Sequence, residues 1–395
     1  MIKMSRPKTP KTMIDTIILS IPREKVILGP VANGGKTWDL QARTGAYDKY
    51  VHNATAADEK TGLYFPRLTG YRRRFEGSTI RIEFSAPKLI YGNNLDELEA
   101  SQFNDVVAAL KDRMDRMSAY VSVRDLSNAT VTAVHYSRNI DLRNGYTAQY
   151  VISELGKIDL NKRFDLARER YQNDGQSLHA HTFAHAFVVY DKIADLVRGR
   201  KAVDRDQTKK QLALFPSLEK RKEIVRFEVR LSQKKKMNAV FDTLGLGQNP
   251  TFRDVFSEER SVKVMTHYWN TMIEGNSVLL FAHALTPKDL LRQVILSRKK
   301  TKPNHALYLT GLIITARDGK GMRELRSAFG RKMNSRTWYR LVADLKRVAA
   351  DLGAIKPRDW YDQVKSSIVQ YQPFRIQNRA KNKPNKDLRN TLSGP

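Results

Sequence analysis

The sequence alternates between apolar and polar positions in several short segments, which is the pattern of strands that bury one face. Residues 224–231 show it most clearly, since Val225, Phe227, Val229 and Leu231 alternate with Ile224, Arg226, Glu228 and Arg230. One face of this predicted strand is therefore apolar and the other largely charged. A second strand is predicted over residues 187–192, where it carries Tyr190 and Lys192, and others lie within 13–22, 77–94 and 129–140.

Apolar residues spaced three and four positions apart predict helices elsewhere. This spacing runs through residues 103–121, and a further helix is expected over 146–170. Beyond about residue 236 helical spacing dominates, with a short helix over 322–329 and a longer one for which Ser335 is the predicted N-cap. The order of elements predicts an α+β fold. We expect a mostly antiparallel sheet with helices on one face and chemistry on the other, followed by a mainly helical C-terminal domain.

The length of 395 residues exceeds that of one ordinary core, so two domains with tails are expected. We predict a basic N-terminal extension over residues 1–12 and a first domain over 13–235. A helical DNA-binding domain over 236–372 and a disordered basic tail over 373–395 follow. Residues 199–222 are polar and rich in charge, and we expect them to form a mobile insertion in the first domain.

Positive charge is concentrated near the C-terminus of a chain whose net charge is +29. Residues 296–395 contain 23 Lys and Arg but only 7 Asp and Glu. This imbalance is typical of a nucleic-acid-binding surface, with a merely soluble basic surface as the alternative. Two helices joined by the basic turn at 330–332 are compatible with a helix-turn-helix, from which Arg336 and Arg340 would reach DNA. Lys299 and Lys300 are further predicted DNA contacts in this segment.

The absence of cysteine excludes disulfides and thiolate metal sites, and it fits a reducing cytoplasm. No apolar run reaches the ~18 residues that a membrane span requires, so no membrane association is expected. A tyrosine, a carboxylate and arginines on one sheet face of so basic a chain indicate phosphodiester chemistry on a polyanion, with Arg226 and Arg230 as predicted DNA contacts. The sequence therefore points to an enzyme that nicks DNA.

Short motifs occur in a fixed order along the chain: Met13-Ile14-Asp15, Glu83 followed by residues 85–94, Tyr190-Asp191-Lys192, residues 225–230, and Asn334-Ser335 before Trp338-Tyr339-Arg340. Together, from about Met13 to Ile355, they resemble the gene II replication initiators of filamentous phages and related plasmids. The resemblance implies a domain related to the HUH endonucleases, with Tyr190 as nucleophile. Such proteins nick one strand of double-stranded DNA at the origin, keep the 5′ phosphate on tyrosine, and rejoin the ends after rolling-circle synthesis.

The resemblance also sets expectations about binding partners and cellular location. We expect contacts with double-stranded and single-stranded origin DNA, a host helicase and a DNA polymerase, in the cytoplasm of a bacterial host. A homodimer is compatible with this function. Residues 29–37 imitate a phosphate-binding loop, but their spacing is one residue too long, so a turn is the better interpretation and the helicase is expected to be a separate protein.

Tyrosine suits nicking and resealing because its phosphodiester retains the energy of the broken bond. A free tyrosine has a pKa of about 10, so a nearby cation is needed, and Lys192 or a metal ion would supply it. Mg²⁺ or Mn²⁺ is the expected cofactor, which would polarise the scissile phosphate. Glu228 and Glu83 are predicted ligands on polar strand faces, with salt bridges as the alternative. His135 is a third predicted ligand, at a position where relatives carry an acidic residue.

His179 and His181 form a His-x-His pair of the kind with which HUH enzymes bind metal, so they are also predicted ligands. Strand parity would place His179, His181 and His185 on the opposite face from Tyr190, unless a bulge intervened. A structural role for the pair is the alternative.

Two other functions remain open. One is a tyrosine relaxase or a transposase-like nickase, which differs only in its DNA substrate. The other is a non-catalytic DNA-binding regulator, which would keep the basic C-terminal helices but lack nicking activity.

Overall fold

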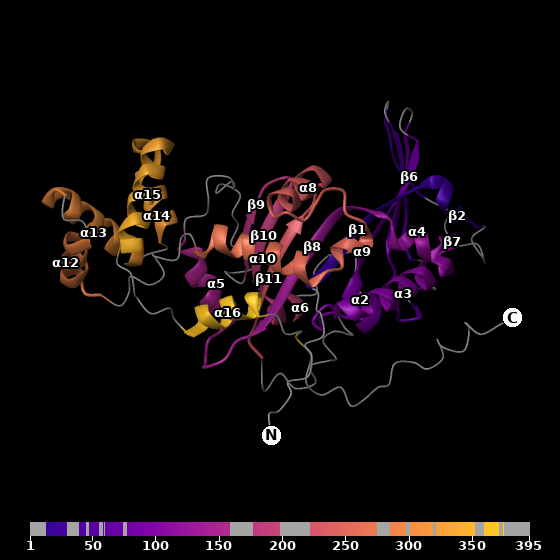
Figure 1. The fold of residues 1–395 in the computed structure, drawn as a ribbon, viewed down its shortest axis with the longest axis horizontal. Coiled ribbons are helices and arrows are strands. Elements are labelled where there is room, and N and C mark those ends of the chain that lie inside the picture. The colour runs from indigo at the N-terminus through magenta and orange to yellow at the C-terminus, as the bar shows by residue number, and fades with distance from the viewer. Residues whose placement is uncertain are drawn as a thin grey trace, which may run out of the picture.

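A nine-stranded sheet organises the fold, and all of its neighbouring strands are antiparallel, in the order β3-β4-β5-β6-β1-β8-β11-β10-β9 (Figure 1). This computed structural model describes residues 13–29, 39–44, 47–54, 58, 60–73, 77–158, 177–197, 222–274, 285–297, 301–318, 321–351, 359–370 and 374. The sheet strands are β1 Ile14–Pro22, β3 Asp39–Arg43, β4 Tyr47–His52, β5 Arg67–Arg73, β6 Ser78–Ser85, β8 Thr130–Asp141, β9 Ser177–His181, β10 His185–Asp191 and β11 Ile224–Leu231. A separate pair joins β2 Ile27–Leu28 to β7 Ala119–Tyr120.

Most of the helices that contact the sheet cover one face of it. They are α2 Ala86–Tyr91, α3 Phe103–Arg116, α4 Val123–Ser127, α5 Ala148–Gly156, α8 Lys234–Thr243, α9 Phe252–Val255, α10 Glu258–Met272 and α16 Asp359–Val369, with short 3-10 turns at Arg23–Lys25 and Ala100–Gln102. The apolar side of β11 faces them, since Phe227 is fully buried and its ring centre lies 5.6 Å from that of Trp269 on α10. The predicted α+β class and antiparallel sheet are confirmed.

The polar face is partly covered at one end. Helix α6 (Lys192–Val197) packs Ile193 and Leu196 against Ile224, which shares its face of β11 with Arg226 and Glu228. Leu95 belongs to the same small cluster. The expectation that helices lie on one face alone is therefore corrected, because α6 covers part of the polar face. This cover explains why charged side chains on the polar face are buried.

The helices after residue 236 divide between two cores. Helices α8, α9, α10 and α16 contribute to the core of the sheet through residues such as Phe241, Trp269 and Trp360. A second core is formed by α12 Pro287–Ser297, α13 Pro303–Asp318, α14 Met322–Phe329, the 3-10 turn Gly330–Lys332 and α15 Ser335–Asp351. Figure 1 shows these helices, in orange, gathered at one end of the view. The last helix, α16, thus returns the chain to the sheet.

Several expectations lie outside the described residues: the N-terminal extension 1–12, almost all of the turn at 29–37 and of the insertion at 199–222, and almost all of the tail 373–395. The helix predicted over 146–170 is present as α5, and residues 159–176 lie outside the described part. Strands β3, β4 and β5 were not predicted. None of the helices in the described ranges has the length and apolar character that a membrane span requires.

Candidate functional site

The polar face of the sheet carries three rows of side chains that cross strands β9, β10, β11 and β8. The backbone register places Ser177, Tyr190, Arg226 and Asn139 in the first row. His179, Val188, Glu228 and Ser137 form the second row, and His181, Ala186, Arg230 and His135 form the third. The strands therefore place the predicted tyrosine, carboxylate and arginines on one surface, as the alternation in residues 224–231 predicts.

Glu228 is the centre of this arrangement. Tyr190 Oη donates a hydrogen bond to Glu228 Oε2 at 3.2 Å, and Arg230 Nε donates to Glu228 Oε1 at 2.9 Å. His135 Nδ1 lies 3.6 Å from Glu228 Oε1. The carboxylate is 3% exposed, so these contacts rather than water hold its charge.

Arg226 is buried and links two carboxylates of the site. Its side chain is 1% exposed, and it donates to Asp15 Oδ2 at 2.5 Å and to the backbone oxygen of Asn94 at 2.6 Å. Its Nε lies 3.8 Å from Glu228 Oε2. A guanidinium buried between two carboxylates cannot reach a phosphate on the surface, so the predicted direct contact of Arg226 with DNA is corrected to a supporting role. Arg230, whose side chain is 37% exposed, remains accessible.

The charges of the site fix the protonation of its central pair. Burial by itself raises the pKa of Glu228, but Arg230 and Arg226 outweigh burial and hold that pKa far below its usual range. Burial raises the pKa of Tyr190 well above 10, Arg226 opposes this, and the charge of Glu228 adds to it. At neutral pH the site therefore holds a neutral phenol that donates to an ionised carboxylate.

Lys192 lies close to Tyr190, but it projects from a helix and not, as predicted, from the same strand. The strand ends at Asp191, and Lys192 is the first residue of α6. Its ammonium group is 5.6 Å from the centre of the Tyr190 ring and 3.2 Å from Asp195 Oδ2. Burial lowers the pKa of Lys192, and Asp195 opposes that shift. Lys192 thus packs against the ring of the tyrosine.

The His-x-His pair lies on the same face as Tyr190, which corrects the parity argument. Residues 177–191 form two strands instead of one, because the chain turns back between His181 and His185. His179 and His181 consequently project from the edge strand β9 on the side of Glu228, whereas His185 lies on the opposite face. Burial lowers the pKa of His179 to about 4, with a smaller effect from Arg230, so this imidazole is neutral at neutral pH.

Glu83 is not part of this cluster. It is an exposed residue of β6, and β1 and β8 lie between β6 and the strand that carries Glu228. Three strand spacings correspond to roughly 14 Å, which is too far for the two carboxylates to share an ion. The same separation divides His135 from His181 within their row. The predicted ligands therefore do not form one set.

The surroundings of Glu228 do not fit a divalent cation as they stand. Arg226, Arg230 and the tyrosine hydroxyl occupy its oxygens, and the two guanidinium groups would repel a second cation there. Within the described ranges, no group of three or more His, Asp or Glu side chains has the geometry of a metal site. The Mg²⁺ or Mn²⁺ cofactor stays a prediction.

Glu228→Gln should therefore behave as the loss of an ion-pair partner. We expect the free energy of unfolding to fall by about 3 kcal/mol, because neutralising one partner leaves buried guanidinium charge uncompensated. If the protein nicks DNA, as the sequence predicts, nicking should fall as well, and added Mn²⁺ should not restore it. Thermal denaturation and nicking of supercoiled plasmid over a Mn²⁺ series measure both effects.

Glu83→Gln is the matched control, since it makes the same change at an exposed position of the same face. The effect of pH adds a second check. A depressed pKa in the folded state means that Glu228 stabilises the fold above the ordinary glutamate pKa of about 4.3 and that this stabilisation is lost as pH falls further. The stability difference between wild type and Glu228→Gln should thus shrink below about pH 4. Rescue of nicking by Mn²⁺ would instead make Glu228 a metal ligand.

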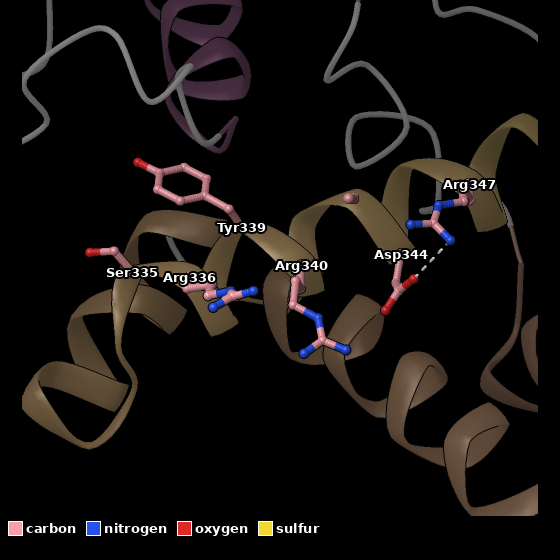
Figure 2. A pocket seen from close by; sticks show the side chains of 7 residues that line it. Ser335, Arg336, Tyr339, Arg340, Asp344 and Arg347 are labelled. Atoms are coloured by element: carbon pink, nitrogen blue, oxygen red, sulfur yellow. Dashed lines mark ion pairs between the residues drawn. The ribbon is translucent and has the colours of Figure 1, made fainter.

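A second basic surface lies on α15. Arg336, Arg340 and Arg347 follow one side of this helix, and with Ser335, Tyr339, Ala343 and Asp344 they line a shallow pocket (Figure 2). Asp344 pairs with Arg347 at 3.5 Å, whereas Arg336 and Arg340 are exposed. The N-cap is Asn334 instead of the predicted Ser335, because Asn334 Oδ1 accepts from the backbone of Thr337 at 2.8 Å. Lys299 and Lys300 lie outside the described residues.

Asp15 is the main residue of the site to which the sequence analysis gave no role, although it belongs to the first of the ordered motifs. It is 5% exposed, accepts from Arg226, and also accepts from Ser85 Oγ at 2.9 Å. Its signal was a single carboxylate at the start of an otherwise apolar strand. A charge buried in such a strand needs a partner, and this requirement points to the arginines of β11.

Comparison of the chain with protein-family models, curated proteins and solved structures gives no match.

Proposed function

We propose that this protein is a rolling-circle replication initiator. It would nick one strand of double-stranded phage or plasmid DNA at the origin through a 5′-phosphotyrosine, and rejoin the ends after a round of synthesis. The observation that carries the proposal is the hydrogen bond from Tyr190 to Glu228 beside the accessible Arg230. The antiparallel sheet, the net charge of +29 and the ordered motifs that resemble gene II initiators support it. The host helicase, the polymerase and the bacterial cytoplasm belong to the same proposal.

The chemistry follows from the neighbours of Tyr190. Tyr190 Oη attacks phosphorus, a bond forms between the phenolic oxygen and the 5′ phosphate, and the bond from phosphorus to the 3′ oxygen breaks. The phenolic proton passes to Glu228, which already accepts its hydrogen bond, the 3′ oxygen takes a proton from water, and the proton on Glu228 neutralises the hydroxide that this leaves. Rejoining reverses these steps, with the 3′ hydroxyl as nucleophile. Arg230 would stabilise charge on the phosphate.

Substrate binding would itself activate the base. In the described state Arg230 holds the pKa of Glu228 low, which makes the carboxylate a weak proton acceptor. A phosphate that draws the Arg230 guanidinium to itself removes part of that effect, so the pKa of Glu228 rises toward its ordinary value. Tyr190 would then lose its proton only when DNA is bound, so the phenolate would form only where a phosphate is present for it to attack.

The test is a covalent adduct. Full-length protein is incubated with a supercoiled plasmid that carries a filamentous-phage origin and with 5′- and 3′-labelled origin strands, and the products are separated on a denaturing gel. We expect nicked plasmid and a protein band that carries label from the 5′ side of the nick. Binding without any adduct would favour the non-catalytic regulator, and label from the 3′ side would contradict the proposed polarity.

The exposed arginines of α15 are proposed to contact duplex DNA. Changing Arg336 and Arg340 together to alanine should weaken duplex binding and reduce the slope of log affinity against log salt by about 0.9 for each phosphate that is no longer neutralised. Fluorescence anisotropy at several salt concentrations measures both quantities. Equal weakening on origin and random duplex indicates phosphate contacts, whereas weakening on the origin alone indicates a base contact.

Arg292→Ala provides the control for charge, because Arg292 is exposed on α12 in the same group of helices and does not line the α15 pocket. An unchanged salt slope in the Arg336 and Arg340 variant would leave α15 as a solvated surface.

A further inference from the structure

The tip of the β9–β10 hairpin presents an aromatic ring to solvent. Phe183 is 86% exposed, more than any other large apolar side chain in the described part of the chain. Single exposed apolar residues are common and need no explanation by themselves. The neighbours of Phe183 and the rigidity of its backbone make this one different.

The hairpin tip is held by hydrogen bonds on both sides of Phe183. Thr182 N–H donates to His185 O at 2.8 Å, and Thr182 Oγ1 accepts from the backbone of Ala184 at 3.2 Å. Ser232 N–H, from the end of β11, donates to Ala184 O at 3.0 Å. The ring therefore stands on a fixed backbone, so a ligand that stacks on it orders little additional chain.

The hydrogen bond from Ser232 brings the hairpin tip next to a run of lysines. Lys234, Lys235 and Lys236 follow two residues later and form the first turn of α8, and Lys234 and Lys235 are exposed. Helix α8 packs against β8 and β11 on the helix-covered face of the sheet, and its first turn lies at the end of the sheet where the hairpin tip is. A helix start favours acidic side chains, and the first turn of α8 contains none. Three lysines at this position cost stability, which an anionic ligand would offset.

The hairpin tip and the start of α8 lie at the same end of the sheet, and the polar face leads from that end toward Tyr190. The row that contains His181, Ala186 and Arg230 lies between the hairpin tip and the row of Tyr190. Strand β10 runs from His185, next to the tip, to Tyr190, and these five residue steps correspond to roughly 17 Å. An aromatic ring with adjacent cations on a path to a phosphate-binding arginine has the composition of a binding site for single-stranded nucleic acid.

We propose that Phe183, Lys234 and Lys235 form a stacking platform for an unpaired base of the DNA strand that enters the Tyr190 site. The base stacks on the exposed ring, and the two ammonium groups contact the adjacent phosphates. The identity of this strand as the one that is cut rests on the proposed nicking function. The binding of single-stranded DNA does not require that function.

The experiment measures binding of a fluorescein-labelled, mixed-sequence single-stranded 20-mer to full-length protein. Phe183→Ala should weaken binding about tenfold, and Phe183→Trp should retain it, because stacking requires an aromatic face. Lys234→Gln with Lys235→Gln should reduce the salt slope by about 0.7 for each phosphate that is no longer neutralised. Tyr120→Ala is the control, since Tyr120 is a 43% exposed aromatic residue on the separate β2–β7 pair.

Several outcomes would overturn the platform. The first is that the wild-type protein does not bind the 20-mer. The second is that Phe183→Ala binds and nicks like wild type. The third is that Phe183→Trp binds as poorly as Phe183→Ala. A change from dimer to monomer in sedimentation with unchanged DNA affinity would instead make the hairpin tip a contact between two copies. If Phe183→Ala loses single-strand binding but wild type never forms an adduct, the platform stands and the nicking proposal fails.

Discussion

Tyr190→Phe should leave supercoiled plasmid uncut, with nicking reduced at least about 1,000-fold, as expected when the attacking group of an enzyme is removed. Binding of origin DNA should stay near the wild-type value. The ring and its packing against Lys192 are retained, and only the hydroxyl that donates to Glu228 is removed. The covalent 5′ adduct on a denaturing gel and the affinity by anisotropy measure the two effects separately.

The control for this variant is Tyr136→Phe. Tyr136 is fully buried on the opposite face of the sheet, where its hydroxyl donates to the backbone oxygen of Val255 at 3.3 Å. Losing that hydrogen bond should cost about 1 kcal/mol of stability and leave nicking intact. A covalent adduct on the Tyr190→Phe protein would show that another tyrosine is the nucleophile, and Tyr171, outside the described residues, would be tested next.

The stability of the Tyr190→Phe protein also separates the two roles of the hydrogen bond. If Tyr190 Oη serves only to satisfy Glu228, the variant loses about 1 kcal/mol of stability and little else. If it is the attacking atom, the loss of nicking is far larger than that change explains. The ratio of the two effects therefore distinguishes a catalytic hydroxyl from a structural one.

The polar face of β11 could be predicted from the sequence because strand parity depends only on the backbone. Arg226, Glu228 and Arg230 lie on one face, as their spacing of two requires. The same rule failed for His179 and His181, because it was applied across a turn. Residues 182–184 are Thr-Phe-Ala, without the Gly, Asn, Asp or Pro that usually marks a hairpin.

Strands β3, β4 and β5 gave a weak signal for a different reason. They form one edge of the sheet, and most side chains of β4 are partly exposed, so apolar and polar residues do not alternate cleanly. The burial of Arg226 was also hidden, because the carboxylate that compensates it, Asp15, is 211 positions away in the sequence. Local patterns predict which face a side chain occupies, whereas its partners depend on the order of strands in the sheet.

Arg226→Met should reduce the free energy of unfolding by about 4 kcal/mol, the largest stability effect expected at this site. The substitution keeps an apolar stem but removes the charge that lies between Asp15 and Glu228. Asp15, which is 5% exposed, would lose its ion pair while remaining buried. Urea denaturation measures the change, and Arg43→Ala, at a side chain that is 72% exposed, should alter stability by less than about 0.5 kcal/mol.

A double-mutant cycle shows whether the pair with Asp15 carries this effect. Asp15→Asn alone leaves a buried guanidinium with less compensation, and Arg226→Met alone leaves a buried carboxylate. When both changes are combined, neither charge remains unpaired, so the double variant should be more stable than the sum of the single losses predicts, by about 1–3 kcal/mol. Strictly additive losses would mean that the two residues act independently. In that case Arg226 would hold the site through Glu228, and nicking rather than stability would be the more sensitive measure of its loss.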